Sequence, residues 1–208
     1  VLGGLGLFLT AWAAEKVWRN DTQQNQKFSL PWLGLVVITE WHLVWAALSG
    51  METIVFVLII TFCAWLTLRI SHNWLLIGVL IGLSIWVRPD GLTLFGPVLM
   101  LAFFASSDMK DKLANLFKIL GGSAILILPY LVFNLVMDGM IYPNTYFAKQ
   151  AEYAILQNTP FLQRWFQMFF QLQVGVGIVL LPGVIFSLIT FIRRRNWWGI
   201  SWFLWVMG

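Results

Sequence analysis

Charged residues are scarce in this chain of 208 residues. Asp, Glu, Lys and Arg make up 11% of it, whereas hydrophobic residues make up 60%. A typical soluble domain carries about 25% charged residues, so this composition excludes an ordinary soluble protein and indicates a chain whose main solvent is the bilayer. The net charge of +4 does not indicate a nucleic-acid partner, because cytoplasmic loops that face anionic lipid account for it.

Residues for several kinds of chemistry are also scarce. The single cysteine, Cys63, lies inside an apolar stretch, so no internal disulfide can form. The two histidines, His42 and His72, are 30 positions apart and do not form a metal-binding pair. The sequence contains no HExxH, Walker loop, GxGxxG or GxSxG motif. We therefore predict no metal site and no cofactor for these residues.

Eight apolar stretches run through the sequence. They predict an all-α, polytopic transmembrane bundle in which residues 1–208 form part of a single domain. Several inner stretches have 14 or 15 residues and reach about 21–23 Å, less than a hydrocarbon core of about 30 Å. These spans are expected to extend into their flanking turns or to stop short of the far interface around a cavity. The stretches are 2–14, 30–48, 54–68, 74–87, 92–105, 113–137, 174–192 and 197–208.

The thirteen Lys and Arg residues are unevenly distributed if these stretches are membrane spans. Alternate connectors must lie on opposite sides of a bilayer, and this rule places ten cations on one side and three on the other. Cytoplasmic loops carry the excess of Lys and Arg, so the side with ten is predicted to face the cytoplasm. The ten are Lys16, Arg19, Lys27, Arg69, Lys110, Lys112, Lys118, Arg193, Arg194 and Arg195, and the three are Arg88, Lys149 and Arg164.

Three polar segments share the predicted outer side. They are SGMET (49–53), RPDG (88–91) and the long loop that begins DGMIYPNTYFAKQ (138–150). Because they lie on one side, these three segments can contribute to one site.

Two connectors are predicted to contain interfacial helices. Ser107 and Asp108 favour the start of one helix. Pro160 favours the start of another, in which Arg164 and three glutamines lie opposite Phe161 and other aromatic residues. This second helix is predicted to lie in the outer headgroup plane.

The polar segments carry a resemblance to a known family. The strings WAALSGMET (45–53), RPDG (88–91) and GMIYPNTYFAK (139–149) together resemble bacterial integral-membrane glycosyltransferases of the GT-C superfamily. The nearest branch includes the mycobacterial arabinofuranosyltransferases and the protein-mannosyltransferase-like enzymes of lipopolysaccharide synthesis. Such enzymes transfer a sugar from a polyprenyl-phosphate carrier to a cell-envelope glycan, lipid or protein acceptor on the outer side of the cytoplasmic membrane.

Arg88 and Lys149 are the residues expected to bind the donor phosphate. Cleavage of a sugar–phosphate bond leaves negative charge on the lipid phosphate, and a fixed cation stabilises that charge best where water is excluded. Arg88 has an alternative role as a snorkelling residue at the end of a span, paired with Asp90. Lys149 has an alternative place in an interfacial loop that tyrosines anchor.

Polar residues in the same segments are expected to contact the sugar or to orient the cations. Glu52 has an alternative role, in which it only complements the dipole of the helix that follows. The residues of this group are Glu52, Thr53, Asp90, Asn144 and Tyr146.

The resemblance lacks one expected part. In the GT-C superfamily the catalytic carboxylate usually lies in an acidic motif of the first outer loop, and nothing before Gly50 supplies one. The chain begins without Met or a basic segment and stops partway through an apolar run, so we expect it to be truncated at both ends. The catalytic residue is then expected upstream of residue 1. The identity of this residue is unknown, and the binding of a divalent metal by that upstream loop stays an open alternative.

Glu40 and His42 are ionisable residues within a predicted span. Such residues are costly in a bilayer, so a paired or functional role is expected, either structural or in a proton pathway. Two residues apart on a helix, they are expected to point in different directions and not to form a tight pair. Gly78 and Gly82 form a small-xxx-small pair, which predicts close helix packing.

Two other functions stay open at this point. One is a transporter or flippase of lipid-linked sugars, which would also use an intramembrane glutamate and broken helices. The other is a noncatalytic membrane subunit that supports a partner protein.

Overall fold

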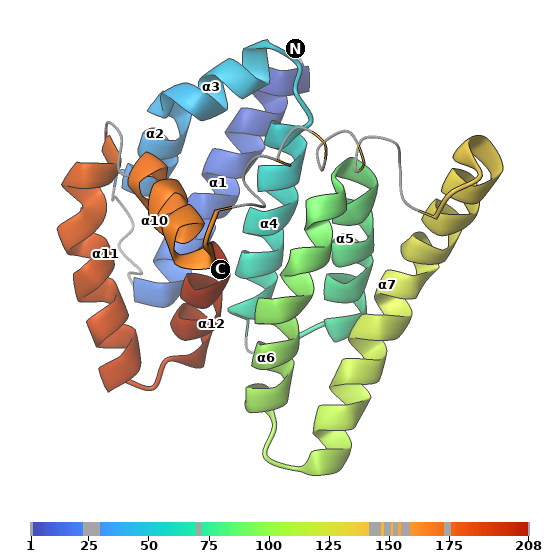
Figure 1. Ribbon diagram of the computed structural model, residues 1–208. Helices are drawn as coiled ribbons and strands as arrows, with labels where there is room; N and C mark the ends of the chain where they lie inside the picture. Colours follow the sequence, from blue (N-terminus) through green and yellow to red (C-terminus); the bar gives the residue numbers. More distant parts are fainter. Residues whose placement is uncertain are drawn as a thin grey trace. The chain divides into compact units, whose positions relative to one another are not determined.

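The computed structural model describes residues 2–22, 30–69, 72–141, 147, 151, 154, 159–172 and 176–207 (Figure 1). The chain forms two compact units, residues 1–129 and 130–208. The regular structure in the described ranges is helical and includes no strand, which confirms the all-α prediction.

One described helix is long and apolar enough to cross a membrane. It is residues Met109–Met137 of helix α7, a stretch of 29 residues. Four other apolar helices have between 10 and 17 residues, namely Thr53–Thr67, Trp74–Val87, Pro89–Ala105 and Leu181–Arg193.

Unit 1 is a bundle whose helices alternate in direction (Figure 1). In that view α1 runs downward, α2 and α3 upward, α4 downward, α5 upward, α6 downward and α7 upward. We call the end that carries residues 49–53 and 88–94 the upper end, and the end that carries residues 68–69, 72–73 and 105–109 the lower end. The bounds are α1 Leu2–Thr22, α2 Trp32–Thr39, α3 Trp41–Leu48, α4 Thr53–Thr67, α5 Trp74–Val87, η1 Pro89–Leu94, α6 Phe95–Ala105 and α7 Met109–Asp138.

The sequence predicted one continuous helix over residues 30–48. The structure instead has two helices of eight residues each. Helix α2 ends at Thr39, and Glu40 has an extended backbone with φ −68° and ψ 117°. The Glu40 carboxylate accepts a hydrogen bond from the Leu43 amide and so caps α3. A side chain that satisfies a helix N-terminus favours a new helix start at this point, which explains the break.

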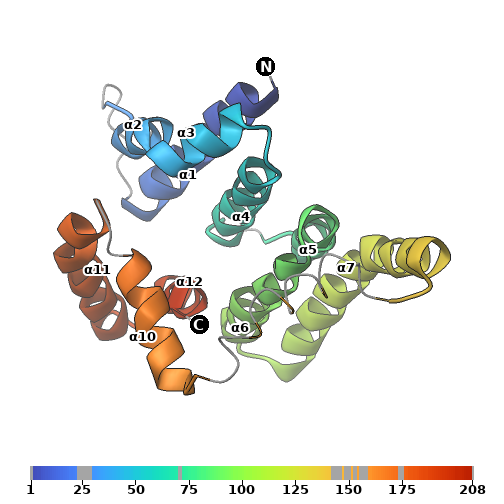
Figure 2. The ribbon, with the colours of Figure 1, turned by 45° about the horizontal axis from the view of Figure 1, so that its top comes forward.

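A second carboxylate satisfies the start of α2. Glu15 of α1 is buried, and its Oε2 accepts hydrogen bonds from the amides of Leu33 and Gly34 at 3.1 and 3.2 Å. Its Oε1 pairs with Arg19 Nε at 2.9 Å. Glu15 therefore attaches α2 to α1, and the two helices lie side by side in Figure 2.

Glycines allow α5 and α7 to approach closely, as predicted for Gly78 and Gly82. A Cβ atom on Gly78 would overlap the Ile119 carbonyl, and one on Gly82 would lie 2.8 Å from the Ser123 oxygen. Gly122 of α7 faces the Leu75 carbonyl in the same way. Figure 2 shows the two helices side by side.

Unit 2 contains the end of α7, α10 (Phe161–Leu172), α11 (Val176–Arg193) and α12 (Trp197–Met207). Helix α10 begins directly after Pro160, as predicted, and Phe161, Phe166 and Phe170 are exposed on it. Gly139 has φ +67° and ends α7, because glycine adopts this conformation without strain.

Candidate functional site

The RPDG segment forms a tight turn at the upper end of unit 1. Helix α5 ends at Val87, and Arg88 takes an extended conformation with φ −150° and ψ 133°. This conformation is the one that the residue before a proline favours. The 3-10 helix η1 starts at Pro89 and folds back on α5, so that Gly91 lies against Ser84. The turn thereby fixes the backbone from which the Arg88 side chain extends.

The Arg88 guanidinium contacts α4 and η1. Nη1 lies 3.4 Å from Thr53 Oγ1, and Nη2 pairs with Asp90 Oδ2 at 3.0 Å. Cζ lies 5.7 Å from the centre of the Phe56 ring, within the range of a cation–π contact. Nε is buried, and within the described residues no hydrogen-bond partner reaches it.

These contacts leave the guanidinium able to bind an anion. The Arg88 side chain keeps 24% of its surface exposed, and its partner Asp90 keeps 54%. An exposed ion pair contributes only about 0–1 kcal/mol. A phosphate can accept two parallel hydrogen bonds from one guanidinium, which makes a stronger and better oriented contact. Arg88 is therefore a fixed cation that an anionic headgroup can reach.

The sequence placed Glu52, Thr53, Arg88 and Asp90 on one side, and the structure brings three of them into contact. Thr53 and Asp90 both bind Arg88. The Glu52 side chain is exposed, and α4 begins at the next residue. This position fits the alternative in which Glu52 complements the helix dipole.

Glu40 and His42 form a tight pair, contrary to the prediction from the sequence. His42 Nδ1 lies 2.7 Å from Glu40 Oε1, although the two residues are only two positions apart. The expectation was wrong because it assumed a continuous helix, whereas Glu40 is extended and precedes α3. The His42 side chain is 86% exposed, so the pair lies on the surface of unit 1.

No protein-family model, curated protein or solved structure matches this chain. A function must therefore be argued from the residues themselves and from the geometry around Arg88.

Three of the predicted site residues, Asn144, Tyr146 and Lys149, lie outside the described residues. The start of their loop is described. Asn134 is buried in α7 and donates a hydrogen bond from Nδ2 to the Ile141 carbonyl at 3.1 Å.

The sequence did not indicate Phe56 as a neighbour of Arg88. Thr53 and Phe56 are three residues apart on α4 and so lie on one face of that helix. This spacing could have indicated that a neighbour of Thr53 is also a neighbour of Phe56. However, only the packing of α4 against α5 places Arg88 above that face.

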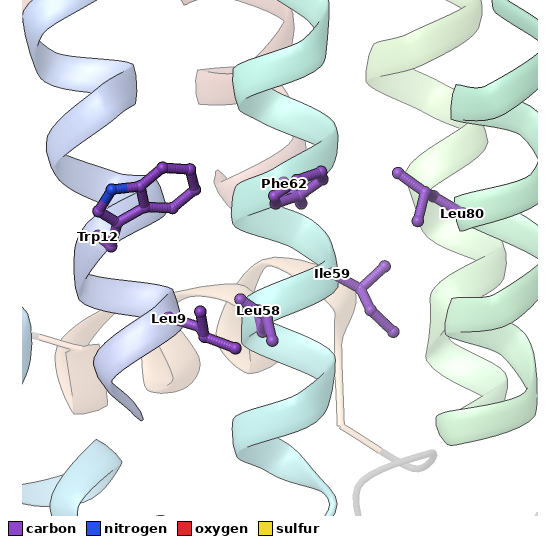
Figure 3. A pocket seen from close by; sticks show the side chains of 6 residues that line it. All are labelled: Leu9, Trp12, Leu58, Ile59, Phe62 and Leu80. Atoms are coloured by element: carbon purple, nitrogen blue, oxygen red, sulfur yellow. The ribbon is translucent and has the colours of Figure 1, made fainter. Parts of the chain in front are cut away.

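An apolar pocket opens along the same helices, farther from the upper end (Figure 3). Its volume is about 200 Å³. It can accommodate part of a hydrocarbon chain but provides no groups for chemistry. The lining residues are Leu9, Trp12, Leu58, Ile59, Phe62 and Leu80, from α1, α4 and α5.

Proposed function

We propose that this chain is part of a polytopic membrane glycosyltransferase that uses a polyprenyl-phosphate sugar as its donor. The observation that carries the proposal is the fixed and accessible guanidinium of Arg88 in the RPDG turn. The proposed location is a bacterial inner membrane, with the upper end of unit 1 facing outward.

The exposed surface supports a membrane location. Large apolar side chains are exposed along α7, including Ile125, Leu128, Val132 and Val136 at 58–77%. Contiguous apolar surface of this kind is rare on soluble monomers and is expected where lipid is the solvent.

The distribution of cations in unit 1 supports the proposed orientation. Arg69, Lys110 and Lys112 lie at the lower end, and Lys16 and Arg19 lie in the second half of α1, which runs toward that end. In contrast, residues 46–56 and 84–97, which lie toward the upper end, carry Arg88 as their single cation. Lys and Arg accumulate on the cytoplasmic side of membrane proteins, so this distribution supports an outward-facing upper end.

The proposed reaction places negative charge near Arg88. An acceptor hydroxyl oxygen forms a bond to the anomeric carbon of the sugar, with inversion, while the bond from that carbon to the phosphate oxygen breaks. The hydroxyl proton goes to a base, and the bonding electron pair stays on the lipid phosphate. A guanidinium that is already oriented stabilises this developing charge.

The apolar pocket supports a lipid donor. Thr53, Phe56, Ile59 and Phe62 follow one another at three-residue spacing along α4, in a row that winds around the helix from one face to the other. The first two contact Arg88 and the last two line the pocket. The same helix thus contributes side chains to the proposed phosphate position and, farther along, to an apolar cavity.

The test is sugar transfer by the purified full-length protein with a labelled polyprenyl-phosphate sugar. Arg88→Gln is expected to lower the turnover at least about 100-fold, because it removes a fixed charge from the developing phosphate anion. Arg69→Gln is the matched control, since Arg69 lies at the lower end over the Trp65 ring, and it is expected to keep full turnover. Normal transfer by well-expressed Arg88→Gln and Lys149→Ala variants would refute the proposal.

One observation favours a second function, a transporter or flippase of lipid-linked sugars. Helices broken within the membrane are typical of transporters, and Glu40 lies at the break between α2 and α3. A transporter would move the labelled lipid across a vesicle membrane without forming a new glycosidic bond, so product analysis separates the two functions.

A further inference from the structure

We propose that Asp90 is an internal counter-ion that competes with an anionic headgroup for Arg88. As a result, Asp90 weakens the binding of a doubly charged phosphate monoester more than that of a singly charged diester. The identity of the ligand rests on the proposed function, whereas the competition between Asp90 and an anion rests on the geometry of the turn.

The RPDG turn places the carboxylate next to the guanidinium whether or not a ligand is present. Arg88 and Asp90 are two residues apart across Pro89, and their Nη2 and Oδ2 atoms lie 3.0 Å from each other. The Asp90 backbone is fixed separately, because its carbonyl accepts a hydrogen bond from Thr93 Oγ1 at 2.8 Å. An incoming phosphate therefore meets a cation that already has a counter-ion.

A phosphate that displaces the Asp90 carboxylate from Arg88 still lies close to that carboxylate. The fixed turn keeps the carboxylate within a few ångströms of any anion bound to Arg88, and like charges at that distance repel each other. Among the described residues, the Arg88 side chain also contacts Thr53 and Phe56, which are neutral and hold the guanidinium in place when Asp90 swings away. Asp90 therefore weakens anion binding without being required to position Arg88.

The repulsion depends on the charge of the ligand. A phosphate diester carries one negative charge, whereas a monoester carries about 1.5–2 at pH 7. In the proposed reaction the sugar donor is the diester and the lipid product is the monoester. Asp90 thus disfavours the product more than the donor and promotes product release.

The test compares two probes, farnesyl phosphate and its methyl diester, by titration calorimetry on the full chain in detergent micelles at pH 8. When the Asp90 carboxylate and a ligand charge are about 6 Å apart in a water-like dielectric, their repulsion lowers the affinity about threefold for each negative charge on the ligand. Asp90→Asn is therefore expected to bind the diester about threefold and the monoester about tenfold more tightly than the wild type does.

Asp108→Asn is the matched control, because Asp108 is an exposed carboxylate at the lower end of unit 1. It changes the net charge equally and is expected to leave both affinities unchanged. An Arg88→Gln/Asp90→Asn double variant is expected to bind neither probe more tightly than the wild type does. Asp90→Ser provides a second variant if the asparagine variant does not fold.

Weaker or unchanged monoester binding by the folded Asp90 variants would overturn the proposal, as would a gain that persists without Arg88. The proposed function fails separately, when the wild-type protein transfers no sugar. A charge-dependent gain in affinity can be observed even in that case, so the two failures are distinguishable.

Discussion

At the scale of single residues, Gly91 determines how closely η1 can approach α5. A Cβ atom at this position would lie 2.6 Å from the carbonyl carbon of Ser84 and 2.8 Å from the Ile85 nitrogen, and it would overlap Ser84 Oγ. Ser84 and Gly91 are both buried. Backbone atoms cannot move aside as a flexible side chain can, so the turn that holds Arg88 depends on glycine at this position.

The variant Gly91→Ala is therefore expected to be destabilised by about 1–3 kcal/mol, the usual cost of an overpacked interior. For a chain of this size, this loss lowers Tm by several degrees. Thermal unfolding in detergent measures the effect.

Gly96→Ala is the control for this prediction. Gly96 lies five residues farther along the chain in α6, and nothing lies within 4 Å of its Cβ position. It is expected to unfold at the wild-type temperature or slightly above, since alanine favours a helix more than glycine does. Equal Tm values for the two variants would show that the contact with Ser84 has no energetic role.

Local contacts were predictable from the sequence at this scale, whereas tertiary contacts were not. The pair of Arg88 with Asp90 was foreseen as one alternative, because two residues separated by a single proline remain close in any turn. The contact of Arg88 with Phe56 was not foreseen, because those residues are 32 positions apart and meet only when α4 packs on α5.

At the scale of helices, small residues control the contact between α5 and α7. Gly78 and Gly82 of α5 face carbonyl groups of α7, and Gly122 of α7 faces the Leu75 carbonyl of α5. Trp86 strengthens the contact, because its indole N–H donates a hydrogen bond to the Leu126 carbonyl at 2.8 Å. Packing of this kind lets two helix backbones come close where lipid provides no hydrophobic drive for association.

Gly121 and Gly122 provide an internal comparison, because they are adjacent in α7 and face different surroundings. Gly122 is buried against α5, whereas nothing lies within 4 Å of the Cβ position of Gly121. We expect Gly122→Ala to lower the free energy of unfolding by about 1–3 kcal/mol. Gly121→Ala is expected to be neutral or stabilising. Thermal unfolding measures both, and an equal loss in both variants would contradict close packing at Gly122.

The sequence predicted most of the helices well, because long apolar runs bounded by polar residues have few alternatives. The stretch 74–87 matches α5 at both ends, and 54–68 differs from α4 by one residue at each end. The stretch 30–48 was not predicted correctly, since its break depends on carboxylate side chains that cap α2 and α3. Hydropathy alone does not detect such caps.

At the scale of the molecule, unit 1 provides a test of its orientation in a membrane. Gly50 lies at the upper end and Ser107 at the lower end, and both are exposed. The native Cys63 is fully buried, so it does not interfere with labelling of introduced cysteines.

Gly50→Cys and Ser107→Cys are therefore expected to react with a membrane-impermeant maleimide from opposite sides of intact cells, the first from outside. The reason is the excess of cations at the lower end, which predicts a cytoplasmic location. Asn144→Cys is expected to react from the same side as Gly50→Cys. Reaction of positions 50 and 144 from opposite compartments would contradict the shared outer site.

The buried carboxylate of Glu15 has a consequence for biosynthesis. Its hydrogen-bond donors are Arg19, one turn away, and the amides of Leu33 and Gly34, which leave the ribosome later. If the Glu15 carboxylate entered lipid before Leu33 and Gly34 were synthesised, it would lack part of its hydrogen-bond donors, at a cost of several kilocalories per mole. In the proposed membrane location, the acid has all three of these donors only after Gly34 has been synthesised, so α1 and the start of α2 are expected to enter the bilayer together.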